Sequence, residues 1–274
     1  MGDYSEFAAL EKTGWSDAAT AQSYADGFAE AAAMCAPALV AAVGVRRGSR
    51  ALDLCTGHGI VAAALNLAGA DVVALDFSPA MLALARSRVS GVEFLEGEAM
   101  DLSFENGRFD AVTIGFGIPH VPDPVHVFAE ARRVLRTGGR FAYSVWCGPE
   151  VEGAFGWVFR AIQQHGDPSV SLPPGPDATV FGTPDVAFPA LKAAGFDEMH
   201  AETVPSVWVN DDPATPYNFF YDGAVRGAAL LRPQPEENKR AIRQDVIDQV
   251  RSNCGSGAGL NIPMPAVVVS ATAS

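Results

Sequence analysis

Basic side chains are scarce in this sequence. The chain has 19 Lys and Arg against 32 Asp and Glu, which gives a formal net charge of −13 over 274 residues. The Lys and Arg residues are also scattered along the chain rather than clustered. Because a field of that sign repels phosphate backbones, the sequence argues against nucleic acid as a partner. A small molecule is the expected substrate.

Paired cysteines and long apolar runs are missing as well. Cys35, Cys55, Cys147 and Cys254 lie far apart and form no C-x-x-C pair, which favours free thiols in a reducing compartment and argues against a metal site. No apolar run reaches the roughly 18 residues that span a bilayer. The N-terminus has no charged-then-apolar signal region. We therefore expect a cytoplasmic protein with no membrane partner.

The segment Arg50–Gly59, with the sequence RALDLCTGHG, is the most informative part of the chain. An apolar run containing Asp53 leads into a Gly-x-Gly turn, Gly57 to Gly59, and then into a helical pattern. A strand, a glycine turn that lets the backbone approach a ligand, and a helix N-terminus together form a cradle for a nucleotide cofactor. The next apolar run ends at Asp76, 17 residues after Gly59, where a carboxylate can accept hydrogen bonds from ribose hydroxyls.

The glycines alone leave the identity of the cofactor open. Residues 57–62 also fit the dinucleotide pattern G-x-G-x-x-A, so an NAD-dependent oxidoreductase is an alternative. Asp53 favours a cationic ligand, because a carboxylate just before the turn repels a pyrophosphate. S-adenosylmethionine (SAM) carries an ammonium and a sulfonium, although an exposed ion pair contributes only about 0–1 kcal/mol.

Further signals follow the glycine turn in a fixed order. They are a short apolar strand over 92–95, the segment Gly97–Phe104, a strand over 109–114, the loop Gly115–Pro124 and the segment Arg133–Arg140. With these signals, residues 50–146 resemble the class I SAM-dependent methyltransferases, in the small-molecule branch that includes the menaquinone/ubiquinone C-methyltransferase-like enzymes. The lead-in over 15–25 is also similar to that branch.

The resemblance implies cofactor roles for residues at the ends of the expected strands. Asp53, Gly57 and Gly59 would hold the methionine portion of SAM, and Asp76 would bind the ribose. The other implied cofactor residues are Phe77, Met81, Glu98 and Ala99 around the adenine, Gly115 and Phe116 beside the methionine chain and the reacting methyl, and Tyr24 closing over the cofactor.

Three positions depart from the pattern of that branch. Cys55 stands where Gly or Ala is common, His58 lies between the two motif glycines, and Pro119 replaces a common His. None of these departures excludes SAM, but His58 puts an unusual polar ring near the methionine end.

The alternation of short strands and helices predicts an α/β fold. We expect a doubly wound, Rossmann-like, seven-stranded and mostly parallel sheet with helices on both faces. The sixth strand falls within 196–209 and an antiparallel last strand within 264–271. Helices are expected over 17–43, with a break near Pro37, and over 216–231.

The expected domain layout has three parts. Residues 1–48 form an N-terminal helical cover, 49–148 the SAM-binding core, and 149–274 the lid insertions with the remaining strands of the same domain. The segments 150–183 and 212–256 are the expected insertions over the active site, where such folds vary their substrate choice.

His120 is the candidate catalytic residue. Methyl transfer from a sulfonium is an in-line displacement, which needs the nucleophile about 3 Å from the methyl and water excluded. A base helps when the nucleophile is a hydroxyl or an activated carbon, and His120 follows the fourth strand on a nearby loop. The alternative is a structural histidine that hydrogen-bonds this loop. Asp110, just inside a strand start, is interpreted as structural.

Aromatic residues are the candidates for the substrate pocket. Their alternative role is to pack the lid onto the sheet. The candidates are Phe116, Trp146, Tyr217, Phe220 and Tyr221.

The sequence thus predicts a SAM-dependent methyltransferase that acts on oxygen or carbon of a small, fairly apolar metabolite. A composition rich in Ala and Gly, with Arg preferred to Lys, is associated with bacterial secondary metabolism. The expected assembly is a monomer or homodimer. The alternatives are a member of the fold with a non-methylating activity, such as a cyclase or hydrolase, and a SAM-binding protein without catalysis.

Overall fold

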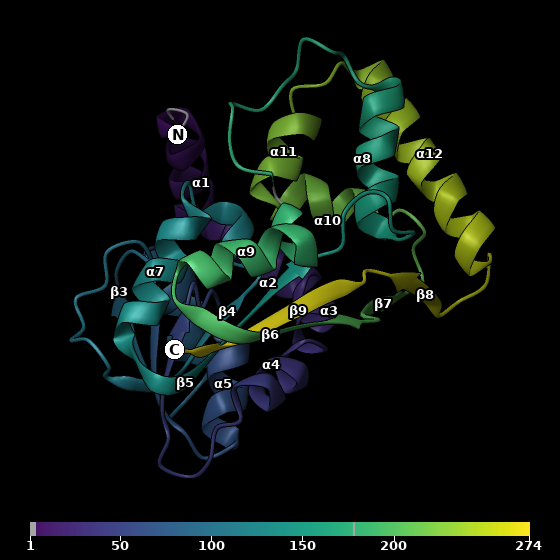
Figure 1. Cartoon of the computed structure of the whole chain (residues 1–274). Coiled ribbons are helices and arrows are strands. Elements are labelled where there is room, and N and C mark those ends of the chain that lie inside the picture. Colours follow the sequence, from purple (N-terminus) through teal and green to yellow (C-terminus); the bar gives the residue numbers. More distant parts are fainter. Residues whose placement is uncertain (1–3, 178) are drawn as a thin grey trace. The chain divides into compact units, whose positions relative to one another are not determined.

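The computed structural model describes residues 4–177 and 179–274 (Figure 1). The chain divides into two compact units. The sheet unit comprises residues 32–146, 176–204 and 266–274, and the helical unit comprises the chain up to Ala31 together with 147–175 and 205–265. Each unit therefore contains segments that lie far apart in the sequence.

The sheet unit contains a seven-stranded sheet with the strand order β3-β2-β1-β4-β5-β9-β6. Neighbouring strands from β3 to β5 pair in parallel, and β9 pairs antiparallel with both β5 and β6. This confirms the predicted sheet and its antiparallel last strand. The strands are β1 (Arg50–Leu54), β2 (Asp71–Asp76), β3 (Glu93–Glu96), β4 (Phe109–Gly115), β5 (Leu135–Trp146), β6 (Phe196–Val204) and β9 (Ala266–Ala273).

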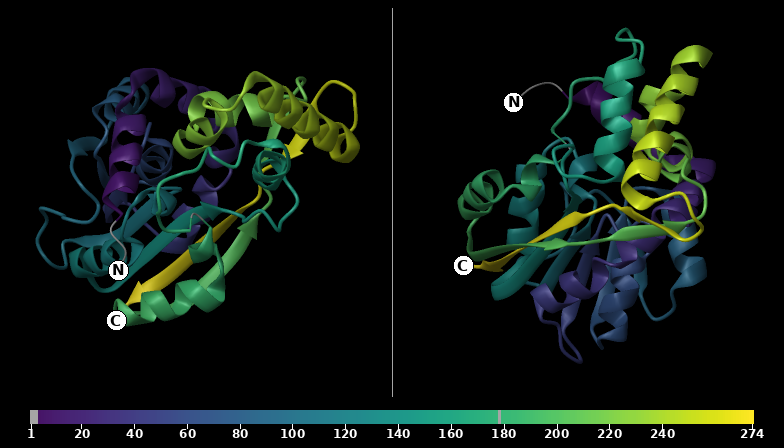
Figure 2. Two further views of the ribbon diagram at one scale, coloured as in Figure 1. Left: turned by 90° about the horizontal axis from the view of Figure 1, so that it is seen from above. Right: turned by 90° about the vertical axis from the view of Figure 1, so that its right-hand side faces the viewer.

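Helices cover both faces of this sheet. In Figure 2, α4 and α5 lie on one face, and α7 and α9 lie on the other. Local sequence sets the starts of α6 and α7: the Ser78 side chain accepts from the Met81 N–H at the start of α6, and a proline follows each of the N-caps Ser78 and Asp123. The helical elements are α4 (Ala36–Val43), α5 (Ile60–Leu67), α6 (Pro79–Arg88), η1 (Ile118–His120), α7 (Pro124–Val134), η2 (Val180–Gly182) and α9 (Pro184–Ala193).

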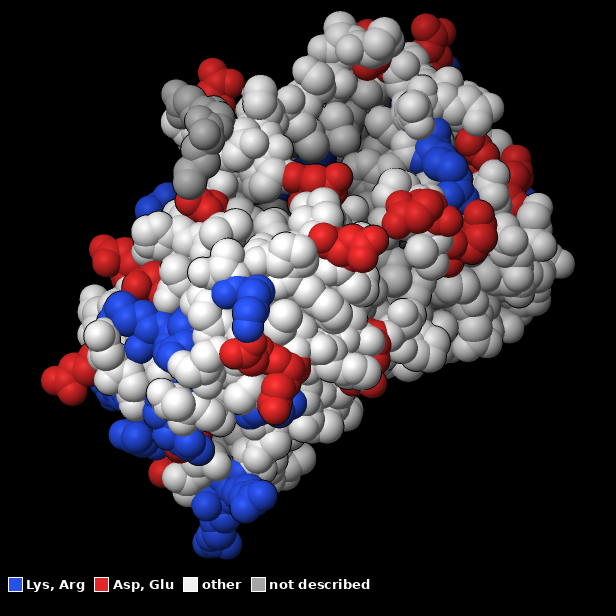
Figure 3. Space-filling model, in the orientation of Figure 1, with Lys and Arg blue, Asp and Glu red and all other residues white. Residues whose placement is uncertain are grey.

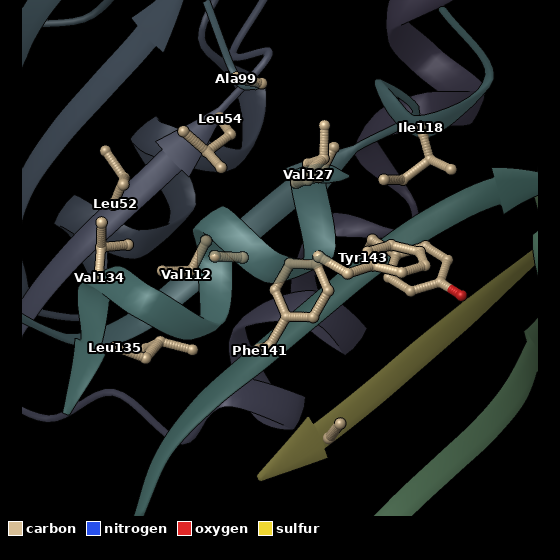
Figure 4. Close-up of a cluster of buried hydrophobic side chains, with 14 of the residues drawn as sticks. Leu52, Leu54, Ala99, Val112, Ile118, Val127, Val134, Leu135, Phe141 and Tyr143 are labelled. Carbon is tan, nitrogen blue, oxygen red and sulfur yellow. The ribbon is translucent and has the colours of Figure 1, made fainter. Parts of the chain in front are cut away.

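The core of the sheet unit lies between the sheet and α7. Leu52, Val112 and Phe141 project from neighbouring strands toward Val127 and Val134 of α7 (Figure 4). All five side chains are fully buried. Burial of this kind contributes roughly 1.5–3 kcal/mol per side chain, so the core fixes the strand ends on which the functional residues lie.

The helical unit contains long helices and a small two-stranded ribbon. Strands β7 (Val207–Asn210) and β8 (Leu260–Pro263) pair antiparallel, and α3 (Ala29–Ala33) spans the boundary between the units. The other helices are α1 (Ser5–Ser16), α2 (Ala18–Gly27), α8 (Ala154–His165), α10 (Thr215–Gly223), α11 (Val225–Leu231) and α12 (Glu236–Cys254).

Two predicted elements are broken differently in the structure. The helix expected over 17–43 is divided into α2, α3 and α4, and Pro37 lies in the first turn of α4, where its missing N–H is not needed. The helix expected over 216–231 breaks at Ala224, whose backbone is extended. Just before this break, a Cβ on Gly223 would lie 2.9 Å from the backbone nitrogen of Tyr24.

The sixth strand ends earlier than predicted, at Val204, directly before Pro205. Residues 207–209, which were predicted to continue it, belong to β7 and pair with β8 as a separate ribbon. This ribbon was not predicted, and helix α1 lies within the expected helical cover over 1–48 although no separate helix was predicted before residue 17. Among the described residues, no single helix has the length and apolar composition to cross a membrane. One bent pair, α2 with 29–43, satisfies that test only in combination.

Candidate active site

The glycine turn after β1 is built from left-handed backbone conformations. Cys55, Gly57 and Gly59 have φ angles of 52°, 53° and 90°, and Gly59 is the N-cap of α5. A Cβ on Gly59 would lie 3.1 Å from Val89 Cγ2, and one on Gly57 would lie 4.0 Å from the Met81 sulfur. The turn thus brings bare backbone close to α6, as a cofactor cradle requires.

Asp76 connects this turn to the next strand. Its Oδ2 accepts from the Gly57 N–H at 2.8 Å and its Oδ1 from the Ser78 N–H at 2.9 Å. Burial raises the pKa of Asp76 to about 6, against the lowering effects of these two N–H groups and of His120. Because each carboxylate oxygen has two lone pairs, both can still accept a ribose hydroxyl.

Asp53 is enclosed by two threonines. Its oxygens accept from the Thr56 hydroxyl at 2.6 Å and from the Thr113 hydroxyl at 2.7 Å. The side chain is 1% exposed, and burial raises its pKa to about 6 against these hydrogen bonds. Thr56, in the turn itself, therefore connects the turn to the Asp53 carboxylate.

The loop after β4 packs tightly beside the glycine turn. A Cβ on Gly115 would lie 2.8 Å from Val61 of α5, and one on Gly117 would lie 2.8 Å from the Cys55 sulfur. Between them, Phe116 has a φ of 59° and its ring stacks on Trp146 with centroids 3.9 Å apart. Both rings are buried. The structure thus brings Phe116 and Trp146 together.

His120 lies in the short helix η1 that follows this loop, and its N–H donates to the Gly117 carbonyl at 2.9 Å. It is close enough to Asp76 for its charge to lower that residue's pKa. Burial, followed by the charges of Asp76, Asp53 and Glu98, raises the pKa of the Cys55 thiol. A group of titratable side chains therefore surrounds the turn.

The residues predicted to surround the adenine follow β2 and β3 in the chain. Phe77 follows β2 directly, and Met81 is buried in the first turn of α6. Glu98 is exposed and forms an isolated β-bridge with Asp101, with buried Ala99 next to it. These residues and Asp76 all belong to the sheet unit.

The remaining candidates belong to the helical unit, where their rings pack on one another. Tyr24 stacks on Phe28 with centroids 5.1 Å apart, and Phe220 meets Phe28 edge-on at 5.5 Å. Tyr217 stacks on Tyr221 at 5.8 Å. Packing accounts for these contacts, and the cofactor and substrate roles of these four residues stay predictions.

Asp110 lies at the other end of β4, away from the turn. It accepts from the Arg50 N–H at 2.8 Å and pairs with Arg136 at 2.6 Å. These contacts agree with its structural interpretation.

On the face shown in Figure 3, Lys and Arg side chains gather mostly at the lower left, and Asp and Glu side chains spread over the rest. The expectation that nucleic acid does not bind stays a prediction.

Sequence reasoning missed the polar residues that support the site. Thr56, Ser78, Thr113 and Ser144 are buried and each bonds to a site residue. Thr56 could have been found from its place in the turn, three residues after Asp53. Thr113 and Ser144 lie inside apolar strand patterns, so their contacts depend on strand register.

Comparison with known proteins agrees with this arrangement. Residues 52–143 match a family model described as "Methyltransferase domain". A demethylmenaquinone methyltransferase of Thermus thermophilus is 37% identical over 185 residues, which cover 60% of this chain and 83% of the relative. One of Clavibacter sepedonicus is 46% identical over 107 residues, covering 38% of this chain and 44% of the relative. The chain thus spans less than half of the Clavibacter protein.

The fold also matches solved structures. A putative methyltransferase of Bacillus halodurans superposes with a TM-score of 0.55 at 21% identity, covering 86% of this chain and 97% of that protein. At this identity the match shows the fold, while the Thermus relative shows the family. The chain belongs to the class I SAM-dependent methyltransferases, and its cofactor is S-adenosylmethionine.

Proposed function

We propose that this protein transfers the methyl group of SAM to an oxygen or carbon atom of a small, fairly apolar metabolite. The observation that carries the proposal is the pair of buried carboxylates at adjacent strand ends, Asp53 and Asp76. Their hydrogen-bond donors are neutral hydroxyl and N–H groups. The negative charge of the two carboxylates suits a cofactor with an ammonium and a sulfonium.

Each part of the site has a distinct role in this proposal. Asp76 binds the ribose hydroxyls while it keeps the Gly57 N–H in place, and Thr56 with Asp53 orients the methionine ammonium. Phe77, Met81 and Ala99 enclose the adenine, with Glu98 at its amino group. When bound, SAM supplies an electrophilic methyl on its sulfonium.

The acceptor is proposed from the comparison with relatives. The Thermus and Clavibacter proteins are named for demethylmenaquinone, which supports an apolar acceptor with a nucleophilic carbon or oxygen here. His120 is proposed as the base, because η1 follows β4 at the same edge of the sheet as Asp76. The protein's place in bacterial secondary metabolism, its cytoplasmic location and its monomeric or homodimeric state stay predictions.

Calorimetric titration of S-adenosylhomocysteine (SAH) tests the cofactor site. We expect micromolar binding to the wild type and at least about 100-fold weaker binding to Asp76→Ala. The substitution removes two hydrogen bonds to a charged group, each contributing about 1.5–3 kcal/mol. Asp110→Ala is the matched control, because that aspartate lies at the other end of β4, and it should bind SAH as the wild type does. A wild type that binds no SAH would refute the proposal.

A further inference from the structure

Three neighbouring strands leave the sheet unit at one level. The chain passes between the two units five times, after residues 31, 146, 175, 204 and 265. The passages after 146, 204 and 265 lie at an end of β5, β6 and β9, and the register places Ala266 opposite both Trp146 and Val204. These three passages therefore lie side by side, and we call them together the strand joint.

Two prolines face each other at the strand joint. The last residue of β6 faces the first residue of β9, and the first residue of β7 faces the last residue of β8. These two facing pairs are three positions apart on both strands, so the ribbon of β7 and β8 keeps the register of the sheet strands. Pro205 therefore falls opposite Pro265. Proline is rare inside a sheet, because it has no N–H to donate to a neighbouring strand.

The two prolines affect the pairing of the strands differently. The Met264 N–H donates to the Ser206 carbonyl at 2.8 Å, and hydrogen-bonded pairs alternate with non-hydrogen-bonded pairs along an antiparallel ladder. Pro205 and Pro265 thus form a non-hydrogen-bonded pair, whose backbone groups point away from each other. Those of Pro205 point to the outer edge, because β6 is the last strand of the sheet.

The backbone of Pro265 points the other way, toward β5. Its carbonyl accepts from the Cys147 N–H at 3.0 Å, but a proline has no N–H to return to Cys147. The ladder between β5 and β9 therefore loses a bond at the strand joint, and the ribbon continues from there as two strands.

The ribbon connects the strand joint to the lid segment, which we define as residues 205–265. Trp208 of β7 is 1% exposed and meets Phe219 of α10 edge-on, with ring centroids 5.1 Å apart. A Cβ on Gly223 of α10 would lie 2.9 Å from the backbone nitrogen of Tyr24. The ribbon, α10 and α2 are therefore held together as one packed group.

The other two passages of the chain lie outside the paired strands. The passage after residue 31 falls in the five-residue helix α3, which is followed by a turn, and the passage after residue 175 falls in the loop before η2. Short helices and loops open more readily than paired core strands. The strand joint therefore sets the resistance to bending between the units.

We propose that the strand joint is a hinge on which the lid segment and α2 open and close over the cofactor site, and that Pro265 keeps this hinge flexible. The inference rests on the proposed function and on the predicted role of Tyr24 in closing over the cofactor. Hinges are formed by a few residues at the ends of elements. An N–H at position 265 would donate to the Cys147 carbonyl and extend the three-stranded ladder across the joint.

Stopped-flow binding of SAH, followed by tryptophan fluorescence, tests this inference without any acceptor. We expect Pro265→Val to slow both association and dissociation of SAH by about two- to twelve-fold, the range of one hydrogen bond. The added bond must break each time the hinge opens, with or without SAH, and it changes no contact to the cofactor. The dissociation constant should therefore stay at its wild-type value.

Pro205→Val is the matched control, because the same substitution at the facing position puts its N–H at the outer edge of β6. It should leave both rate constants unchanged. Hydrogen exchange of the Met264 N–H is a second readout of the joint, and it should slow in Pro265→Val but not in Pro205→Val. If Pro265→Val does not fold, as judged by circular dichroism, Pro265→Ala supplies the same N–H.

The contrary results have different meanings. If Pro265→Val slows exchange of the Met264 N–H but leaves the SAH rate constants unchanged, the joint does not gate the cofactor site and the inference is wrong. If it changes neither readout, or if Pro205→Val has the same effect, the missing N–H of Pro265 does not set the flexibility of the joint, which also overturns the inference. A wild type that binds no SAH would instead contradict the proposed function itself.

Discussion

The two units each bury carboxylates, but they balance the charge in different ways. In the helical unit, Glu11 is 2% exposed and pairs with Arg226 at 2.8 Å while it accepts from Trp15 Nε1 at 2.8 Å. In the sheet unit, Asp53 and Asp76 are also buried, yet their hydrogen-bond donors are neutral hydroxyls and backbone N–H groups. The first arrangement places a positive charge in contact with the carboxylate, whereas the hydrogen-bond donors of the second carry no charge.

This difference separates a structural role from a functional one. A buried ion pair such as Glu11–Arg226 satisfies both partners and fastens α1 to α11. A buried carboxylate with neutral donors has a raised pKa, as Asp53 and Asp76 have, and groups of this kind concentrate where a ligand completes the charge. Cationic SAM is such a ligand.

Isosteric amide substitutions should give the largest contrast. Glu11→Gln removes the carboxylate charge that pairs with Arg226, so we expect it to lower the free energy of unfolding by roughly 3 kcal/mol. Asp53→Asn should change that free energy by no more than about 1 kcal/mol, because an amide can still bond to both threonine hydroxyls. Urea unfolding at pH 7 measures both, and SAM titration should show weaker binding only for Asp53→Asn.

The comparison would fail if Asp53→Asn destabilised the protein as much as Glu11→Gln. Asp53 would then be a structural carboxylate whose charge the fold itself requires. Arg226→Met combined with Glu11→Gln is the control, since removing both charges should restore part of the lost stability.

The pH dependence should sharpen the same contrast with a smaller effect. The pKa of Asp76, and likewise of Asp53, is about 6 in the folded state against an ordinary 3.8. Between these values the folded state holds more protons than the unfolded state, so the contribution of both groups to stability falls as pH rises from about 4 to 6. SAM binding needs the ionised carboxylates, so its affinity should rise over the same range.

Calorimetry of SAM binding between pH 5 and 7.5 measures the expected rise in affinity. Thermal unfolding without ligand measures the expected fall in stability. His120 and Glu98 also act on the pKa of Asp76, so His120→Gln is measured in parallel as a control for the effect of His120 on Asp76. Affinity that is flat through pH 6 in the wild type would contradict the assigned role of the two carboxylates.

The sheet unit was largely predictable from the sequence because its signals are local. The glycine turn, Asp76 after its apolar run, and the prolines at helix starts each determine a nearby piece of backbone, and parallel strands then bring their carboxyl ends to one edge. Asp53, Gly57 and Asp76 were therefore placed together correctly.

The rest depends on contacts between residues that are distant in the sequence. Ser144 meets Phe116 because β5 pairs with β4 in one register, Gly115 opposite Ser144, and nothing in either segment alone specifies it. In the helical unit, Glu11 bonds to Arg226 across 215 positions, and the ribbon of β7 and β8 joins segments some 50 residues apart. The apolar periodicity of single segments carries no such information.

A crystal structure of the protein with SAH tests the central claim most directly. The account predicts that the two ribose hydroxyls lie within hydrogen-bond distance of the Asp76 carboxylate, about 2.5–3.0 Å, with the amino group at Thr56 and the sulfur beside Phe116. SAH bound with its ribose away from Asp76 would contradict the assignment of this edge of the sheet as the cofactor site.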